Sequence, residues 1–167
     1  MKTLIVICGA VLAVAGLALI AGLLLPKTTE AKRTVMIHQP VDRVFSAVAD
    51  VGRQSEWRTD IGKVELAEDG RSWVEHTKAG DRIAFQLEGN RPNELFAISY
   101  VAARGFSGEW VGRFTASSEG TRLDVTERVT IPNPLVRLVG RIIAPPGSHT
   151  DLYLADLQKA MTAPRAP

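Results

Sequence analysis

Large apolar side chains stand at every second position through much of the middle of this chain. A β-strand turns successive side chains to opposite faces, so residues two apart share a face. We therefore expect one apolar, strongly aromatic face of a sheet that curls around the protein interior. The clearest members of this face are Ile83, Phe85, Leu87, Phe96, Ile98, Tyr100, Phe106, Trp110 and Phe114.

Turn-forming residues divide this region into strands at intervals typical of antiparallel hairpins. Gly70, Gly80, Gly105 and Gly120 each separate two β-type stretches, and residues 89–93 form another turn signal. An earlier strand precedes the region, which brings the expected number of strands to seven. The expected strands cover residues 33–37, 61–66, 72–77, 82–88, 95–102, 106–116 and 121–131.

The apolar period is that of a helix on both sides of the β region. Val41, Val44, Phe45 and Val48 follow the i, i+3, i+4, i+7 pattern, and a second short helix is expected over residues 50–56.

The C-terminal segment is expected to form two helical parts. Residues 144–147 contain two prolines and a glycine and should break the helix, and a second part follows over about residues 150–162. The apolar residues with helical spacing in the first part are Leu135, Leu138, Val139, Ile142 and Ile143.

The N-terminal segment is a long apolar run. From residue 4 to residue 25 no side chain is charged, and a helix of this length spans the bilayer core of about 30 Å. A cleaved signal peptide has a shorter apolar region followed by a small-x-small site, whereas this run ends in Leu25-Pro26. The pattern favours an uncleaved transmembrane anchor over a signal peptide. The expected organisation is an anchor over residues 1–25, a linker over 26–32, one folded domain over 33–162 and a flexible tail over 163–167.

Charge around the apolar run bears on its orientation. Lys2 precedes the run, and Lys27, Lys32 and Arg33 follow it. Because positive residues stay on the cytoplasmic side, this bias favours a cytoplasmic domain and leaves the opposite side open. Cys8 is the single cysteine, so no intrachain disulfide forms, which fits a cytosolic domain and also many periplasmic ones.

The polar residues exclude several partner classes. The net charge is +2, from 20 basic and 18 acidic residues, and no basic cluster with interleaved aromatics is present, so nucleic acid is not an expected partner. His38, His76 and His149 are scattered, and no glycine-rich loop opens a helix, so no metal and no cofactor are expected. The oligomeric state stays open.

Two groups of residues carry a resemblance to a known family. The first reads VMIHQPVDRVF at residues 35–45 and is followed by Asp50 and Trp57. The second reads GTRL at residues 120–123, continues to Glu127 and is followed by PNPL at residues 132–135. In this order and spacing, the chain resembles the polyketide cyclase/dehydrase and lipid-transport family of the START-like (SRPBCC) superfamily.

The resemblance implies a fold and a class of ligand. The fold is the α+β helix-grip fold, a curved seven-stranded antiparallel sheet around a C-terminal helix, with two short helices after the first strand. An apolar cavity between sheet and helix would accept lipids, polyketides, steroids or quinones. The chain departs from the family in its membrane anchor and in Pro145-Pro146-Gly147, which interrupt what is usually one long helix and bear on the shape of the cavity mouth.

Glu127 is the clearest polar candidate on an apolar strand face. It shares strand parity with Leu123, Val125, Val129 and Ile131. Because a buried carboxylate without a partner is costly, its interpretation is either a structural ion pair or hydrogen bond, which has more weight, or a ligand-orienting group or general acid/base.

The aromatic face and Glu127 together form the expected ligand-binding set. Tyr100 could offer its hydroxyl to a ligand, although a core aromatic with a wet tip is the simpler interpretation. Glu75 shares parity with Trp73 and Thr77, and its facing is ambiguous. No catalytic residue is assigned. The expected ligand-binding residues are Trp73, Phe85, Leu87, Phe96, Ile98, Tyr100, Trp110, Phe114 and Glu127.

Three functions remain as hypotheses. The first is a membrane-anchored binding or carrier module for a hydrophobic small molecule, and it is favoured over an enzyme. The second is a cyclase/dehydratase-type enzyme that uses Glu127 as acid or base. The third is an interaction domain whose interior is filled by its own side chains. A fold by itself does not choose among them.

Overall fold

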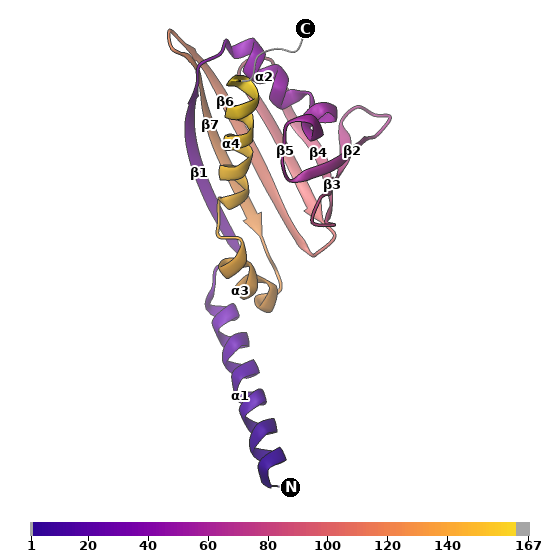
Figure 1. Ribbon diagram of the computed structural model, residues 1–167, viewed down its shortest axis with the longest axis vertical. Coiled ribbons are helices and arrows are strands. Elements are labelled where there is room, and N and C mark those ends of the chain that lie inside the picture. The colour runs from indigo at the N-terminus through magenta and orange to yellow at the C-terminus, as the bar shows by residue number, and fades with distance from the viewer. Residues whose placement is uncertain (1, 163–167) are drawn as a thin grey trace.

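The structure, a computed structural model, describes residues 2–162 and consists of one long helix followed by an α+β domain (Figure 1). α1 (Lys2–Leu24) leads to β1 (Thr28–Ile37), α2 (Val41–Ala49) and the short 3-10 helix η1 (Val51–Glu56). The remaining elements are β2 (Ile61–Leu66), β3 (Ser72–Thr77), β4 (Arg82–Arg91), β5 (Leu95–Ala102), β6 (Phe106–Ser117), β7 (Gly120–Thr130), α3 (Pro134–Ile143) and α4 (Ser148–Thr162).

All seven strands form one antiparallel sheet in the order β1-β7-β6-β5-β4-β3-β2. Strands β2 to β7 pair with their neighbours in the chain, and β1 pairs with β7. This confirms the predicted α+β class, the seven strands, the two short helices after the first strand and the C-terminal helix.

One face of the sheet carries the core. α4 runs along this face, and α2 and η1 cover its end farthest from α1 (Figure 1). Apolar residues of α2 and α4 pack with the sheet in a single cluster. The cluster includes Val44, Phe45, Val48, Phe114, Leu123, Val125, Leu154 and Leu157.

The strand register places the alternating aromatic residues on this same face. Trp73 pairs with Phe85, and Phe85 pairs with Tyr100. Ile98 pairs with Trp110 in the next pair of strands. Directly opposed residues of antiparallel strands point to one side, so the prediction of one aromatic sheet face is confirmed.

The first strand is longer than the sequence predicted. β1 begins at Thr28, so most of the segment predicted as a linker, residues 26–32, is strand. β7 extends to Thr130, which pairs with Thr28. The sequence of β1 is polar because this strand lies at the edge of the sheet. Of residues 28–32, only Ala31 is buried. An edge strand exposed to water lacks the apolar alternation that identifies a strand.

The C-terminal helix is interrupted between α3 and α4, as predicted. Gly147 has a φ of 87°, a left-handed conformation that a residue with a Cβ adopts only with strain. This break lets α3 leave the line of α4, and α3 does not cover the sheet (Figure 1). Its apolar face is exposed through Leu135, Val136, Val139, Ile142 and Ile143.

α1 is long and apolar enough to cross a bilayer, a test that a signal sequence near an N-terminus also passes. It projects away from the sheet, and its C-terminal end contacts α3 (Figure 1). The tail predicted over residues 163–167 lies outside the described residues.

Candidate functional site

Burial of the predicted ligand-binding residues varies across the sheet face turned towards α4. Those on β3, β6 and β7 and two on β5 are buried, whereas those on β4 and one on β5 are only half-buried. The buried ones are Trp73, Phe96, Tyr100, Trp110, Phe114 and Glu127, and the half-buried ones are Phe85, Leu87 and Ile98.

An aromatic row of Trp73, Phe85 and Tyr100 crosses the less covered part of this face. The Phe85 ring stacks on Trp73 with centroids 5.3 Å apart and an interplanar angle of 3°, and it lies 5.5 Å from the Tyr100 ring. Residues 84, 86 and 88 of β4 face the solvent, and the alternate positions of the strand are half-buried. The row therefore presents Phe85 as a partly open apolar surface.

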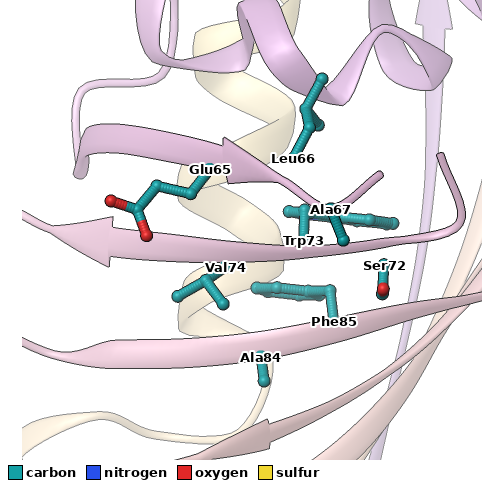
Figure 2. A pocket seen from close by; sticks show the side chains of 8 residues that line it. All are labelled: Glu65, Leu66, Ala67, Ser72, Trp73, Val74, Ala84 and Phe85. Carbon is teal, nitrogen blue, oxygen red and sulfur yellow. The ribbon is translucent and has the colours of Figure 1, made fainter. Parts of the chain in front are cut away.

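The described residues form two shallow, open hollows. One, of about 370 Å³, lies at β2, β3 and β4 and is lined by residues of both strand parities, Leu66, Trp73 and Phe85 on one and Glu65, Val74 and Ala84 on the other (Figure 2). The other, of about 520 Å³, lies between the start of α2 and the β6–β7 turn and has a largely polar lining.

The space under α4 is occupied by packed side chains. Trp110 lies against Tyr153 of α4 at 5.6 Å, and at the end of the sheet covered by α2 Phe45 lies against Phe114 at 5.2 Å. Neither of the two hollows lies there. Aromatic rings from the helices and the sheet thus meet next to α4, and the half-buried part of the apolar face lies beside it, on β4.

A polar trio of Tyr100, Glu127 and Thr150 lies within this apolar face. The Tyr100 hydroxyl donates a hydrogen bond of 2.9 Å to Glu127 Oε1, and the Thr150 hydroxyl donates one of 2.5 Å to Glu127 Oε2. All three residues are buried. The trio joins β5, β7 and the first turn of α4. Glu127 therefore points inward, as its strand parity predicted.

Gly108 allows Tyr100 to reach across β6. The two residues are opposite each other in the register, and a Cβ at position 108 would collide with the Tyr100 ring. Burial, together with the charge and hydrogen bond of Glu127, raises the pKa of the Tyr100 hydroxyl above its ordinary value. Tyr100 therefore stays a neutral hydrogen-bond donor at physiological pH.

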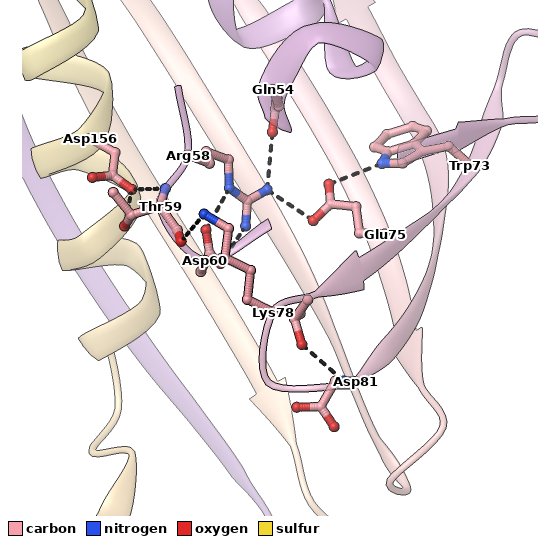
Figure 3. Close-up of polar contacts among 10 residues, drawn as sticks. Gln54, Arg58, Thr59, Asp60, Trp73, Glu75, Lys78, Asp81 and Asp156 are labelled. Carbon is pink, nitrogen blue, oxygen red and sulfur yellow. Dashed lines mark hydrogen bonds and ion pairs between the residues drawn. The ribbon is translucent and has the colours of Figure 1, made fainter. Parts of the chain in front are cut away.

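A second polar cluster surrounds Arg58 between η1 and β3 (Figure 3). Its guanidinium donates hydrogen bonds to Gln54 at 3.0 Å, to Glu75 at 2.9 Å and to Asp60 at 2.9 and 3.2 Å. It also lies 5.3 Å from the centre of the Tyr153 ring. Such a dense set of partners is typical of a structural ion-pair network.

Glu75 is fixed in this network. Only 2% of the residue is exposed, and its other oxygen accepts a hydrogen bond of 3.2 Å from the Trp73 indole. Burial raises the pKa of the Glu75 carboxyl, an effect that the nearby Arg58 charge opposes. The facing that was ambiguous from the sequence is inward, and both carboxylate oxygens of Glu75 accept hydrogen bonds from protein side chains.

The loop of residues 57–60, which carries Arg58, also anchors α4. The Thr59 backbone N–H and hydroxyl both donate to Asp156 of α4 at 2.7 Å (Figure 3). Trp57 packs edge-on against Tyr153 at 5.3 Å. α4 is thereby held against the sheet at its middle by this loop and at its first turn by Thr150.

Several of these residues were missed by sequence reasoning. Thr150 lies at the start of the segment predicted as the second C-terminal helix, and no pattern indicated that its hydroxyl donates a hydrogen bond to Glu127. Arg58 lies in a loop, which has no periodic pattern. Asp156 is an acidic residue on a helix, and its type gave no indication that it is buried. Tyr153 had a usable signal, because it is flanked by the apolar residues of α4.

No group of three or more His, Cys, Asp or Glu side chains that could hold a metal ion occurs in the part of the chain that the structure describes. The polar groups of the site offer hydroxyls and a carboxylate. A hydroxyl that donates to Glu127 keeps lone pairs that can accept a hydrogen bond from a ligand.

The order of elements and the inward-facing aromatic residues have a counterpart in a protein family. A family model described as polyketide cyclase / dehydrase and lipid transport matches residues 28–151. The chain belongs to this family. The sequence resemblance is thus confirmed over β1 to the first turn of α4. Among curated proteins, no sequence match is found.

Several solved structures share this fold. The START superfamily protein from Mycobacterium smegmatis has a TM-score of 0.62 at 15% identity, over 79% of this chain and 96% of that one. Mll3558 from Rhizobium loti has a TM-score of 0.62 at 23% identity, over 80% and 99%. DynU16, a putative protein in the dynemicin biosynthetic locus, has a TM-score of 0.58 at 18% identity, over 79% and 46%. At these identities the likeness concerns the fold.

Proposed function

We propose that this member of the polyketide cyclase/dehydrase and lipid-transport family is a membrane-attached binding or carrier module for a hydrophobic small molecule of the lipid, quinone or polyketide type. The observation that carries the proposal is the aromatic row, with Phe85 half-buried at its centre, beside the polar trio. Small-molecule sites are lined mainly by apolar and aromatic side chains, with a few convergent polar groups. The rings would hold the apolar body of the ligand, and the hydroxyls of Tyr100 and Thr150 would orient its polar end.

Membrane attachment by α1 belongs to the same proposal. A ligand of this kind dissolves in lipid, so a tether raises the effective concentration of the binding surface at the source of the ligand. The residues that follow α1 include Lys27, Lys32 and Arg33, and this bias favours a domain on the cytoplasmic side.

A cyclase/dehydratase activity is the alternative, and the trio is the observation that favours it. Catalysis of this kind needs convergent polar groups, and here Glu127 meets two hydroxyls. Both carboxylate oxygens are already satisfied within the protein, however, and this favours a structural or orienting role.

Mass spectrometry of solvent extracts tests the proposal. The full chain, purified in detergent from expressing cells, is expected to release one apolar compound in near-stoichiometric amount. Phe85→Ala should lower this amount strongly. Gln86→Ala, the neighbour that faces solvent on the opposite side of β4, is the matched control and should leave it unchanged. Equal loss in both variants, or no retained compound in the parent protein, would contradict ligand binding at this face and favour an interior filled by its own side chains.

The same extracts separate carrier from enzyme. In a carrier, Glu127→Gln lowers the retained amount without changing the identity of the compound. In a dehydratase, the compound retained by Glu127→Gln is heavier than that of the parent protein by the mass of one water molecule.

A further inference from the structure

α3 exposes an apolar face that no other part of the described chain covers. Ile142 and Ile143 are 74% and 76% exposed. At 100° per residue they fall on one side of the helix together with Leu135, Val136 and Val139, whereas Arg137 and Arg141 fall on the opposite side. A contiguous exposed apolar surface on a small domain marks a contact with another molecule or a membrane.

Arg137 fixes α3 to the end of α1. The residue is 5% exposed, and its guanidinium donates hydrogen bonds to the carbonyl oxygens of Gly22 at 3.0 Å and Leu25 at 2.7 Å. The last carbonyls of a helix lack partners within the helix, so Arg137 caps α1. Gly22 also lies against the Pro134 carbonyl, where a Cβ would collide. α3 is thus held where the apolar helix ends.

α3 and the segments that flank it carry positive charges and no negative ones. No acidic residue occurs between Arg128 and Asp151. Lys27 and Arg141 are exposed and form no ion pair within residues 2–162. A helix with an apolar face on one side and the exposed Arg141 on the other, with the exposed Lys27 following α1, suits the boundary between acyl chains and anionic headgroups.

We infer that α3 is a membrane-surface helix, whose apolar face lies among the lipid headgroups and upper acyl chains next to α1. The proposal rests on the membrane attachment by α1 proposed above and goes beyond it. α1 alone would tether a freely tumbling domain, whereas α1 and α3 together fix its orientation. The occupant of the α3 face is then phospholipid, not a second copy of the chain.

Depth measurements on the full chain in vesicles of phosphatidylcholine and phosphatidylglycerol test the inference. Cys8, the single cysteine, is replaced by serine, and one cysteine is introduced at Ile142, at Val14 of α1 or at Glu119 of the β6–β7 turn. The side chains at all three positions are exposed in the structure of the chain, so a fluorescent label there leaves the packing intact. Each label is then exposed to nitroxide lipids and to aqueous iodide.

The expected result is that the labels at Ile142→Cys and Val14→Cys are quenched by nitroxide lipids and severalfold protected from iodide, whereas the label at Glu119→Cys shows the reverse. Iodide quenching at position 142 with lipid quenching at position 14 would overturn the surface helix and leave the anchor standing. Iodide quenching at both positions would overturn the anchor as well. Protection of the label at position 142 from both quenchers, together with disulfide formation between copies of the unlabelled Ile142→Cys variant, would show that a second chain covers α3 and would also overturn the inference.

Discussion

At the scale of single residues, Arg58 is the cation at the centre of a buried network of polar side chains. It comes from a loop, yet its guanidinium bridges η1, β3 and Asp60 while it lies over the Tyr153 ring of α4. The charge of Glu75 is balanced by the Arg58 guanidinium, and its other oxygen accepts a hydrogen bond from the Trp73 indole. The network therefore holds α4 and the β3 side of the sheet together.

Arg58→Ala is expected to destabilise the domain strongly. It leaves the Glu75 carboxylate buried without its cation, and breaking a buried pair in this way costs about 3–5 kcal/mol. The measurement is urea unfolding followed by tryptophan fluorescence. Arg53→Ala, which removes an exposed ion pair with Glu56, is the matched control and should change little. Similar effects of both substitutions would contradict a structural role for the Arg58 network.

The two tyrosines of the chain make a second residue-scale prediction, on pH. Burial raises the pKa of both Tyr100 and Tyr153; the Glu127 charge adds to it at Tyr100, and at Tyr153 the Arg58 charge opposes it. Because each folded-state pKa lies above the unfolded value near 10, their contribution to stability is complete below about pH 10 and is lost as the pH rises further, by about 1.4 kcal/mol per pH unit for each tyrosine.

Tyrosinate absorbance during an alkaline titration measures this directly. The absorbance of the folded protein should stay flat through pH 10 and rise only with loss of tryptophan fluorescence. A tyrosinate signal that develops near pH 10 while the fold persists would show that these hydroxyls are accessible to solvent.

At the scale of elements, the contact between α1 and α3 rests on one glycine and one arginine. A methyl group at Gly22 would collide with the Pro134 carbonyl, whereas one at Gly16 meets nothing within 4 Å. Gly22→Ala should therefore separate α1 from α3. The segment around Lys27, which is already exposed, should then become more accessible to the protease, whereas Gly16→Ala should leave its accessibility unchanged. The measurement is the rate of tryptic cleavage after Lys27 in detergent micelles. Equal rates in the two variants would mean that α1 and α3 are not docked.

The elements also show what a sequence can predict. The alternation of Phe85, Ile98 and Trp110 was enough to define the sheet face, because strand periodicity is a local property. The inward position of Glu127 followed from the same parity. β1 was predicted too short, since an edge strand with solvent on its outer side carries no such alternation.

Contacts between distant segments were beyond this kind of reasoning. The spacing of α3 predicted an apolar face but not that the sheet leaves it uncovered. The contact of Arg137 with the end of α1 and the burial of Arg58 both depend on how separate elements meet. A loop or helix arginine has no sequence pattern that distinguishes a buried hydrogen-bonding role from an exposed one.

At the scale of the whole molecule, the parts follow one axis (Figure 1). α1 and α3 lie at one end, the sheet with the polar trio and the aromatic row follows, and α2 with η1 lies at the far end. Membrane attachment at the first end would place the apolar sheet face within reach of molecules that leave the bilayer. The central claim is that this face is a binding surface.

Photo-crosslinking with a diazirine fatty acid tests that claim most directly. The full chain is irradiated with the probe in vesicles, and the modified residues are mapped by mass spectrometry of peptides. The account predicts adducts on the inward positions of β4 and β5, around Phe85 and Ile98, in addition to those on α1 and α3, with fewer on the sheet when unlabelled fatty acid competes. Adducts confined to α1 and α3 would contradict it.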